Sequence, residues 1–346
     1  MRRWKLLLNL ATLAALALLV FFSRDQLGST LGDLKHINLW ILALLIPIEL
    51  LNYHGQTKLY QHLFAVIGTK LKYRFLFRTS LELNFVNHIF PSGGVTGISY
   101  FGLRMRRDEQ ISGVQATLVQ VMKLALTFLS FQVLIIVGLI ALAVVGKVNG
   151  ILLLVGTALS TLLLVGNAIF AYIVGDKRRI NASFLFITRL LNRLLRVVRP
   201  KSPETINIDN AKGLFNDFHN NYQLLRHEWR SLRWPFAYAF IMNATEVAAA
   251  YVVYLAFGDV VNIGAVILAY AVANFAGLVS VLPGGVGVYE ALMISVLGSA
   301  GIPPGLSLPA TVMYRIVTTI IQVPPGYYYY QKTLAESGAK PADNHA

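Results

Sequence analysis

Long apolar stretches separated by short polar ones follow one another along the whole chain. They lie at about 6–22, 37–55, 79–103, 112–145, 150–174, 235–257, 262–300 and 306–330. An apolar run of about 18 residues or more is long enough, as a helix, to cross a hydrocarbon core of roughly 30 Å. The pattern predicts an all-α, polytopic membrane protein with one integral membrane domain over 1–346. The first stretch is too long for a signal-peptide core and no A-x-A site follows it, which predicts an uncleaved span.

Proline and glycine interrupt two of these stretches near their middles. The interruptions read NFVNHIFPSGGVTG at 84–97 and NFAGLVSVLPGGVG at 274–287. Irregular backbone is tolerated at membrane depth only where protein or a water-filled cavity surrounds it. These two segments are therefore predicted to enter the membrane and turn back rather than to cross it.

The basic residues indicate the sidedness of the chain. Lysines and arginines flank 79–103 on both sides, between 58 and 78 and between 104 and 107. A full crossing would place one cluster on the wrong side of the membrane, so the positive-inside rule predicts a re-entrant hairpin that enters from the cytoplasm and turns at Pro91. The flanks of 262–300 lack basic residues, which predicts a hairpin that enters from the outside. About six full crossings remain, and both termini are then cytoplasmic.

The two halves of the chain, about 37–145 and about 235–330, then contain the same elements in opposite orientations. The two interrupted segments resemble each other, and Lys123 follows Val95 by 28 residues as Arg315 follows Val286 by 29. Inverted repeats whose broken helices meet near the midplane are typical of secondary transporters. The alternative is a chance similarity between two Gly-rich turns.

Composition agrees with the membrane class. The chain is 56% hydrophobic and 13% charged, whereas soluble domains carry about 25% charged residues. The net charge of +14 lies mostly in short segments beside apolar runs, which favours topology and anionic headgroups over nucleic acid as its explanation. The chain has no cysteine, which excludes disulfides, thiolate metal sites and cysteine nucleophiles.

One longer polar segment, 176–234, is predicted to be cytoplasmic. Within it Arg189, Arg193 and Arg196 follow one stripe of an amphipathic helix suited to an anionic membrane surface. The alternative is an ordinary positive-inside loop that packs on its own bundle. Residues 333–346 are predicted to form a disordered tail.

Ionisable side chains inside the predicted spans are candidates for function because an unpartnered polar group is costly in lipid. They are Glu49, Glu82, His88, Lys123, Glu246, Glu290 and Arg315. Each cation should face the bundle interior and a carboxylate or phosphate. Glu246 and Glu290 are candidate partners of Arg315, and Glu82 or Glu49 of Lys123. Ion pairs that only fix helix register are the alternative.

The Gly-rich turns suggest an anion site. Where a hairpin breaks, the next helix begins with unpaired N–H groups and a partial positive charge, and glycine allows a ligand to approach that backbone. Two such ends, with Lys123 and Arg315 nearby, predict an electropositive pocket for a phosphate near the midplane. A plain structural break is the alternative for either turn alone. The turn residues proposed for this pocket are Pro91, Gly93, Gly94, Gly97, Pro283, Gly284, Gly285 and Gly287.

Motifs for catalysis are absent from the sequence. The histidines show no metal-ligand spacing with Asp or Glu, and no G-x-S-x-G, Walker A or dinucleotide fingerprint occurs. We therefore expect no catalytic residue, no metal and no cofactor.

Two blocks resemble the paired signatures of the lysylphosphatidylglycerol synthase transmembrane-region family, a flippase-like integral membrane domain. They are PSGGVTGISYFGLRMRR with the following QATLVQVMK, and LPGGVGVYEALMISV with the following ATVMYR. The resemblance extends over about 5–332 and implies a lipid translocase, or an accessory to the export of lipids or lipid-linked saccharides. The positions that match are Pro91, Gly93, Gly94, Gly97, Arg104, Pro283, Gly284, Gly285, Gly287, Glu290 and Arg315.

Two departures from the family pattern affect the first half. Ile98, Ser99 and Tyr100 stand where the family often has an acidic residue. Lys123 replaces the usual arginine, and Met122 before it replaces a glutamate. Glu290 is therefore expected to act without a first-half counterpart. The chain leaves no room for the soluble aminoacyltransferase domain, so synthase activity is not expected.

The combined prediction is a multi-pass cell-membrane protein that moves an anionic phospholipid or a polyprenyl-phosphate-linked lipid between leaflets. Arg104, Arg189, Arg193 and Arg196 are predicted to lie at the membrane surface. The expected partners are membrane lipids, with a second copy or a lipid-modifying enzyme as further candidates and no nucleic acid. The alternatives are a secondary transporter of a small anion and a non-catalytic partner of a lipid-modifying or glycosyltransferase enzyme. Short external loops disfavour an embedded transferase.

Overall fold

The computed structural model of the chain describes residues 37–89, 95–146, 148–176, 178–179, 182, 229–279 and 287–337. These residues form helices and no strand. The first predicted span, 6–22, lies outside them, as do Arg189, Arg193 and Arg196 of the predicted amphipathic helix. The helices are α2 (Leu39–Leu42), α3 (Leu45–Val66), α4 (Tyr73–Ile89), α5 (Val95–Glu109), α6 (Gly113–Val144), α7 (Gly150–Val174), η2 (Trp229–Leu232), α10 (Arg233–Ala256), α11 (Ile263–Val279), α12 (Val288–Ser299) and α13 (Pro304–Ser337).

Local sequence signals explain several helix boundaries. Ser112 accepts a hydrogen bond from the Gln115 N–H at the start of α6, and Asn149 accepts one from the Leu152 N–H at the start of α7. Such caps satisfy N–H groups that have no partner within the helix. Gly68 and Gly258 follow α3 and α10 with φ angles of +83° and +88°, a left-handed conformation that favours glycine at a helix C-terminus.

Four helices are long and apolar enough to cross a membrane: α6, α7, α10 with the end of η2, and α13. They correspond to the predicted spans at 112–145, 150–174, 235–257 and 306–330. The predicted span at 37–55 becomes α2 and α3, and α3 buries a polar stripe of Glu49, Asn52 and Gln56. This integral membrane character agrees with the sequence prediction, while the number and sidedness of the crossings stay predictions.

The interrupted stretches are two pairs of shorter helices. α4, α5, α11 and α12 contain 12 to 17 residues each, so at 1.5 Å per residue they are roughly 18 to 26 Å long. A full crossing needs roughly 30 Å. α4 and α5 run antiparallel, because Asn87 lies against Gly97 near the turn while Glu82 contacts Arg104 farther from it.

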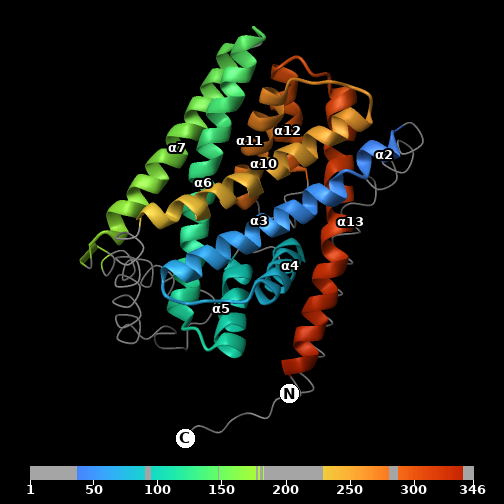
Figure 1. Ribbon diagram of the computed structural model, residues 1–346. Helices are drawn as coiled ribbons and strands as arrows, with labels where there is room; N and C mark the ends of the chain where they lie inside the picture. Colours follow the sequence, from blue (N-terminus) through green and yellow to red (C-terminus); the bar gives the residue numbers. More distant parts are fainter. Residues whose placement is uncertain are drawn as a thin grey trace, which may run out of the picture.

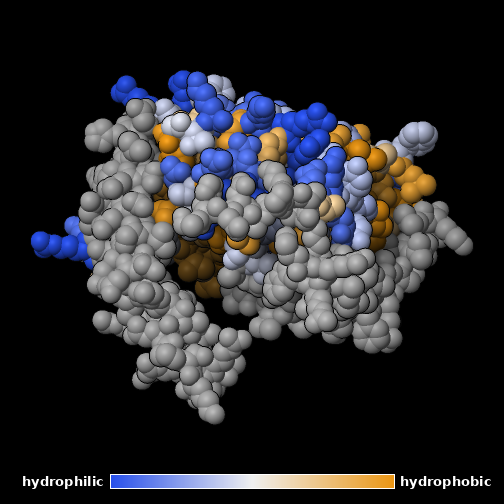
Figure 2. Space-filling view, turned by 90° about the horizontal axis from the view of Figure 1, so that it is seen from below, coloured by the Kyte–Doolittle hydropathy of each residue, from blue (hydrophilic) through white to orange (hydrophobic). Residues whose placement is uncertain are grey.

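This antiparallel pairing places both basic clusters of the first half at one end of the molecule. Lys70, Lys72 and Arg74 lie exposed at the start of α4, and Arg106 lies exposed at the end of α5. Figure 2 views the molecule from below and shows hydrophilic residues gathered over part of this face, with hydrophobic ones beside them.

The contacts between helices pair up between the two halves. α3 with α4, α4 with α5 and α5 with α6 have counterparts in α10 with α11, α11 with α12 and α12 with α13. Contacts across the halves pair in the same way, since α4 packs on α13 and α11 packs on α6. α3 and α10 pack on each other at the centre. Figure 1 shows α4 and α5 below this central pair and α11 and α12 above it.

Glycines allow three of these contacts to be close. A Cβ on Gly55 would lie 3.3 Å from the Tyr238 carbonyl oxygen between α3 and α10, and one on Gly326 would lie 2.7 Å from the Leu81 carbonyl oxygen between α13 and α4. Gly264 of α11 lies against the carbonyl oxygen of Gly138 in α6. Small residues permit such close approach of membrane helices.

The end of α13 corrects one prediction. Residues 333–337 continue the helix to Ser337, so the disordered tail predicted from 333 is wrong for them, while 338–346 lie outside the described residues. Thr333 is buried and donates a 2.7 Å hydrogen bond to Glu82. This contact fixes the last turns of α13 against α4.

Candidate functional site

Two adjoining cavities lie between the halves of the bundle. The first has a volume of about 350 Å³ and the second about 310 Å³. Helices α3 to α6, α10 and α11 line the first, and α12 and α13 contribute to the second. Both are lined by the same four residues at their junction, which are Asn87, Glu246, Tyr270 and Asn274.

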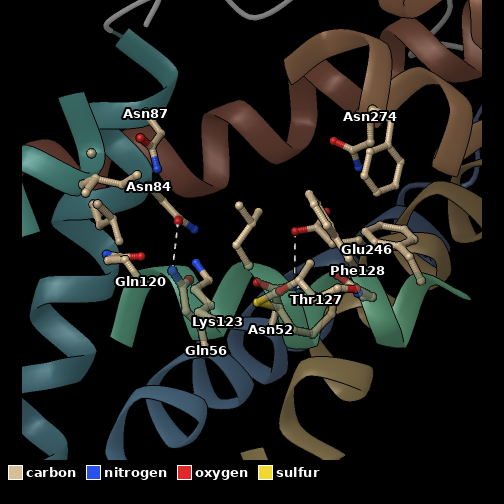
Figure 3. A pocket seen from close by; sticks show the side chains of 18 of the residues that line it. Asn52, Gln56, Asn84, Asn87, Gln120, Lys123, Thr127, Phe128, Glu246 and Asn274 are labelled. Carbon is tan, nitrogen blue, oxygen red and sulfur yellow. Dashed lines mark hydrogen bonds between the residues drawn. The ribbon is translucent and has the colours of Figure 1, made fainter. Parts of the chain in front are cut away.

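The first cavity contains Lys123. Its ammonium lies 5.1 Å from the ring centroid of Tyr60, and no carboxylate oxygen among the described residues comes within 4.0 Å of it. The sequence prediction that Glu82 or Glu49 pairs with Lys123 is therefore wrong. Figure 3 shows Lys123 and Gln120 on one side of the cavity and Glu246 and Asn274 on the other.

Lys123 belongs to a row of hydrogen-bond donors along α6. Gln120, Lys123 and Thr127 all line the cavity, and spacings of three and four residues place them on one helix face. The Nε2 atom of Gln120 and the Oγ1 atom of Thr127 are buried without a hydrogen-bond partner in the described part of the chain. Buried donors of this kind call for an acceptor, so this face suits a ligand with several oxygen acceptors.

Amide side chains form much of the remaining lining. Each amide offers both donors and acceptors. Gln56 donates to the Asn84 amide at 3.4 Å, and Asn52 donates to the Glu246 carboxylate at 3.1 Å. Sequence reasoning missed these amides because it considered only ionisable side chains inside the predicted spans, although amides inside apolar spans also indicate a polar interior. They are Asn52, Gln56, Asn84, Asn87, Gln120, Asn243 and Asn274.

Glu246 forms part of the wall common to both cavities. Its carboxylate accepts hydrogen bonds from Asn52 at 3.1 Å, Tyr270 at 3.2 Å and Tyr314 at 2.9 Å. These donors come from α3, α11 and α13, so three helices are joined at one carboxylate of α10. Sequence reasoning named Glu246 but not the tyrosines, because their approach depends on helix packing.

Arg315 in the second cavity forms an ion pair with Glu290, which confirms this predicted pairing. Its guanidinium also lies 5.0 Å from the ring centroid of Tyr289. The second carboxylate oxygen of Glu290 accepts a 2.6 Å hydrogen bond from the Gly287 N–H. Gly287 caps α12 with φ +87°, so the Glu290 carboxylate occupies the helix N-terminus where the sequence predicted a phosphate.

A second buried ion pair lies on the first hairpin, outside the two cavities. Nε of Arg104 lies 3.1 Å from Glu82, and Tyr100 donates to the same carboxylate at 2.7 Å. Arg104 is 8% exposed and also pairs with Asp108. The side chain of Arg104 therefore turns inward to Glu82, while its predicted place at the membrane surface stays a prediction.

The remaining predicted residues are placed as follows. Gly97 lines the first cavity, and its Cα lies so close to the Asn87 side chain that a Cβ would overlap it. His88 lines the second cavity, with Nδ1 2.9 Å from the Asn84 carbonyl oxygen. Within the described ranges no group of three or more His, Cys, Asp or Glu could hold a metal ion. Outside those ranges lie Pro91, Gly93, Gly94, Pro283, Gly284 and Gly285.

Comparison with known proteins gives a family match over most of the chain. The family described as "Lysylphosphatidylglycerol synthase TM region" matches residues 6–326. A UPF0104 membrane protein of Methanothermobacter thermautotrophicus is 24% identical over 108 residues, which are 31% of this chain and 32% of that protein. A UPF0104 membrane protein of Pyrococcus horikoshii is 23% identical over 194 residues, 56% of this chain and 52% of that protein. The chain thus matches about a third to a half of the length of these curated relatives.

Proposed function

This chain belongs to the lysylphosphatidylglycerol synthase transmembrane-region family, and from that membership and the two cavities we propose that it moves a phosphate-bearing lipid between the leaflets of the cell membrane. The lipid is an anionic phospholipid or a polyprenyl-phosphate-linked lipid. Its phosphate enters the first cavity, and its acyl or prenyl chains stay in the surrounding lipid.

The observation that carries this proposal is the unpaired state of Lys123 in its cavity. A cation inside a membrane protein is costly unless a counter-charge is near, and here the described residues supply none within 4.0 Å. A phosphate provides negative charge and several acceptor oxygens, which match Lys123 and the unpartnered donors of Gln120 and Thr127. The amides opposite can bind the other polar atoms of a headgroup.

The second cavity provides a further cation for the same phosphate. Arg315 is held by Glu290, whose carboxylate also accepts the Gly287 N–H. A carboxylate held by an arginine and a helix N-terminus identifies a position with affinity for anions. In this proposal the lipid phosphate passes from Lys123 to Arg315 and displaces Glu290 on the way.

The membrane arrangement that we propose is an inverted repeat with two re-entrant hairpins, α4–α5 from the cytoplasm and α11–α12 from the outside. Two observations support it. The basic clusters at both ends of the first hairpin lie at one end of the molecule, and the helix contacts of the two halves correspond pair by pair. Both cavities then lie between the hairpins, because α4 and α11 contribute to the lining of each.

Lipid transfer in proteoliposomes tests the proposal. Fluorescent phosphatidylglycerol is placed in both leaflets, and the fraction accessible to an external quencher is followed over time. Wild-type protein should make the inner-leaflet probe accessible, and Lys123→Gln should slow this at least tenfold, because the phosphate loses its only charged contact in the first cavity. Lys72→Gln, at an exposed lysine, is the matched control and should transfer as wild type does.

The alternatives give different results in the same vesicles. A small-anion transporter would accumulate radiolabelled inorganic phosphate without moving the fluorescent lipid. A non-catalytic partner protein would move neither probe. Either result, or full transfer by Lys123→Gln, would overturn the proposal.

A further inference from the structure

The four carboxylates inside the bundle differ in what neutralises them. Glu82 pairs with Arg104 and Glu290 with Arg315. Glu246 and Glu49 have no Lys, Arg or His nitrogen within 4.0 Å in the described part of the chain. Their hydrogen-bond donors are neutral: Asn52, Tyr270 and Tyr314 for Glu246, and Gln322 for Glu49. Carboxylates inside membrane proteins that lack a cation partner are candidates for carrying an exchangeable proton, since proton relays are one established use of intramembrane Asp and Glu.

Of these two carboxylates, only Glu246 can meet the ligand. Glu246 lines both cavities, together with Lys123 in the first and Arg315 in the second. Glu49 lines neither and is 2% exposed. Glu246 therefore lies on the path that the proposed function gives the phosphate, and a charge there acts directly on the bound lipid.

The charge balance of the first cavity changes when an anion enters. Lys123 and Glu246 are the only Lys, Arg, Asp or Glu side chains among the described residues that line this cavity. When both are ionised they contribute one positive and one negative charge. A phosphodiester adds one negative charge. In a water-poor interior the net negative charge is unfavourable, and a proton on Glu246 restores neutrality.

On these grounds, which rest on the proposed function, we infer that Glu246 binds one proton when the lipid phosphate enters the cavity, so that proton and anionic headgroup are bound together. The coupling is reciprocal: lipid binding favours the proton, and a proton on Glu246 favours the lipid. The affinity for an anionic lipid therefore falls as the pH rises through the range in which empty Glu246 loses its proton.

Other titratable and charged groups near Glu246 compete for this role. They come from every helix that surrounds the carboxylate, and the experiment has to separate them from it. They are Glu49 and Tyr53 of α3, His88 of α4, Lys123 of α6, Tyr270 of α11, Tyr289 of α12, and Tyr314 and Arg315 of α13.

Calorimetric titration of the purified full chain with a short-chain phosphatidylglycerol tests the inference. This phosphodiester keeps one charge across the measured range, unlike a phosphomonoester, whose second pKa is about 6. Titrations in buffers of different ionisation enthalpy give the number of protons taken up. Wild type should take up close to one proton per lipid, and its affinity should fall by up to about tenfold per pH unit on the alkaline side.

The variants assign the proton to one residue. Glu246→Gln should bind lipid with no proton uptake and no pH dependence. Glu49→Gln, His88→Asn and the surface control Glu109→Gln should keep the wild-type uptake. Lipid binding by wild type without proton uptake, or uptake that persists in Glu246→Gln and disappears in Glu49→Gln or His88→Asn, would overturn the inference and leave the proposed function standing. A failure of wild type to bind the lipid at any pH would overturn both. If Glu246→Gln does not fold, the wild-type proton count and the other two variants still decide.

Discussion

The two halves of the bundle hold equivalent cations in different ways. Arg315 on α13 has an internal carboxylate, Glu290, which also accepts a hydrogen bond from the N–H of Gly287, the residue that caps α12. Lys123 on α6 has a tyrosine ring and a cavity, with no carboxylate within 4.0 Å among the described residues. The helices around both cations pack in corresponding pairs, so the difference lies in the side chains and not in the arrangement of the helices.

This difference distinguishes a charge that stabilises the fold from a charge that is available to a ligand. A cation with an internal partner contributes to the fold, and a ligand must displace the partner to reach it. A cation without one contributes little to folding and attracts the ligand directly. Under the proposed function, an anion therefore meets Lys123 first and competes with Glu290 for Arg315 later.

The largest effect that this comparison predicts is on stability. Glu290→Gln leaves Arg315 without its carboxylate in the bundle interior, and breaking a buried pair in this way costs about 3 kcal/mol or more. Lys123→Gln strands no carboxylate, so its effect should stay within about 1 kcal/mol. Thermal unfolding of the purified variants measures both. The double variant Glu290→Gln with Arg315→Gln should recover most of the loss, since neither charge remains.

An equal loss in Lys123→Gln and Glu290→Gln would contradict the comparison. It would mean that Lys123 has a structural partner as important as Glu290. Glu109→Gln, at an exposed end of α5, should match wild type in the same measurement.

Much of the fold could be predicted because long apolar runs leave few choices. The run at 150–174 became α7 with the same limits, and 112–145 became α6 within one residue at either end. The pairing of Glu290 with Arg315 could also be predicted, since stranding either charge in lipid is costly.

The polar interior was harder to predict because it depends on how helices meet. Glu82 lies in the same helix pair as Arg104 and pairs with it, which leaves Lys123 without the carboxylate that the sequence suggested. Glu246 is bound by Tyr270 and Tyr314 from two other helices. Neither arrangement follows from the spacing of residues along one segment. The first depends on how α4 and α5 pair, and the second on the crossing of helices distant in the chain.

A smaller effect should come from the glycines at the equivalent crossings of the two halves. Gly264→Ala places a methyl group against the Gly138 carbonyl oxygen, and Gly326→Ala places one 2.7 Å from the Leu81 carbonyl oxygen. Backbone atoms cannot move aside easily, so each change should cost about 1 to 3 kcal/mol. Gly166→Ala in α7, where nothing lies within 4 Å, is the control and should be neutral or slightly stabilising. If thermal unfolding shows a loss of stability for only one of the two variants, the halves differ in how closely their helices pack as well as in their side chains.

The smallest predicted effect comes from giving the first half the internal carboxylate that it lacks. Ile98 is 38% exposed and lines the first cavity with Lys123. Ile98→Glu should pair with Lys123, so that a lipid phosphate has to compete with this carboxylate as it does with Glu290 at Arg315. Binding of short-chain phosphatidylglycerol should weaken by about tenfold, which corresponds to about 1.4 kcal/mol.

The matched variant Ile98→Gln separates charge from shape at this position. It has nearly the size of Glu without the negative charge, so it should bind the lipid within about twofold of wild type. The loss of lipid affinity caused by Ile98→Glu should also disappear in a Lys123→Gln background. There the new carboxylate has no lysine to pair with, and the lipid phosphate has no lysine for which to compete. Equal binding by Ile98→Glu and wild type would mean that Lys123 is not where the phosphate binds, and the assignment of first contact would pass to Arg315.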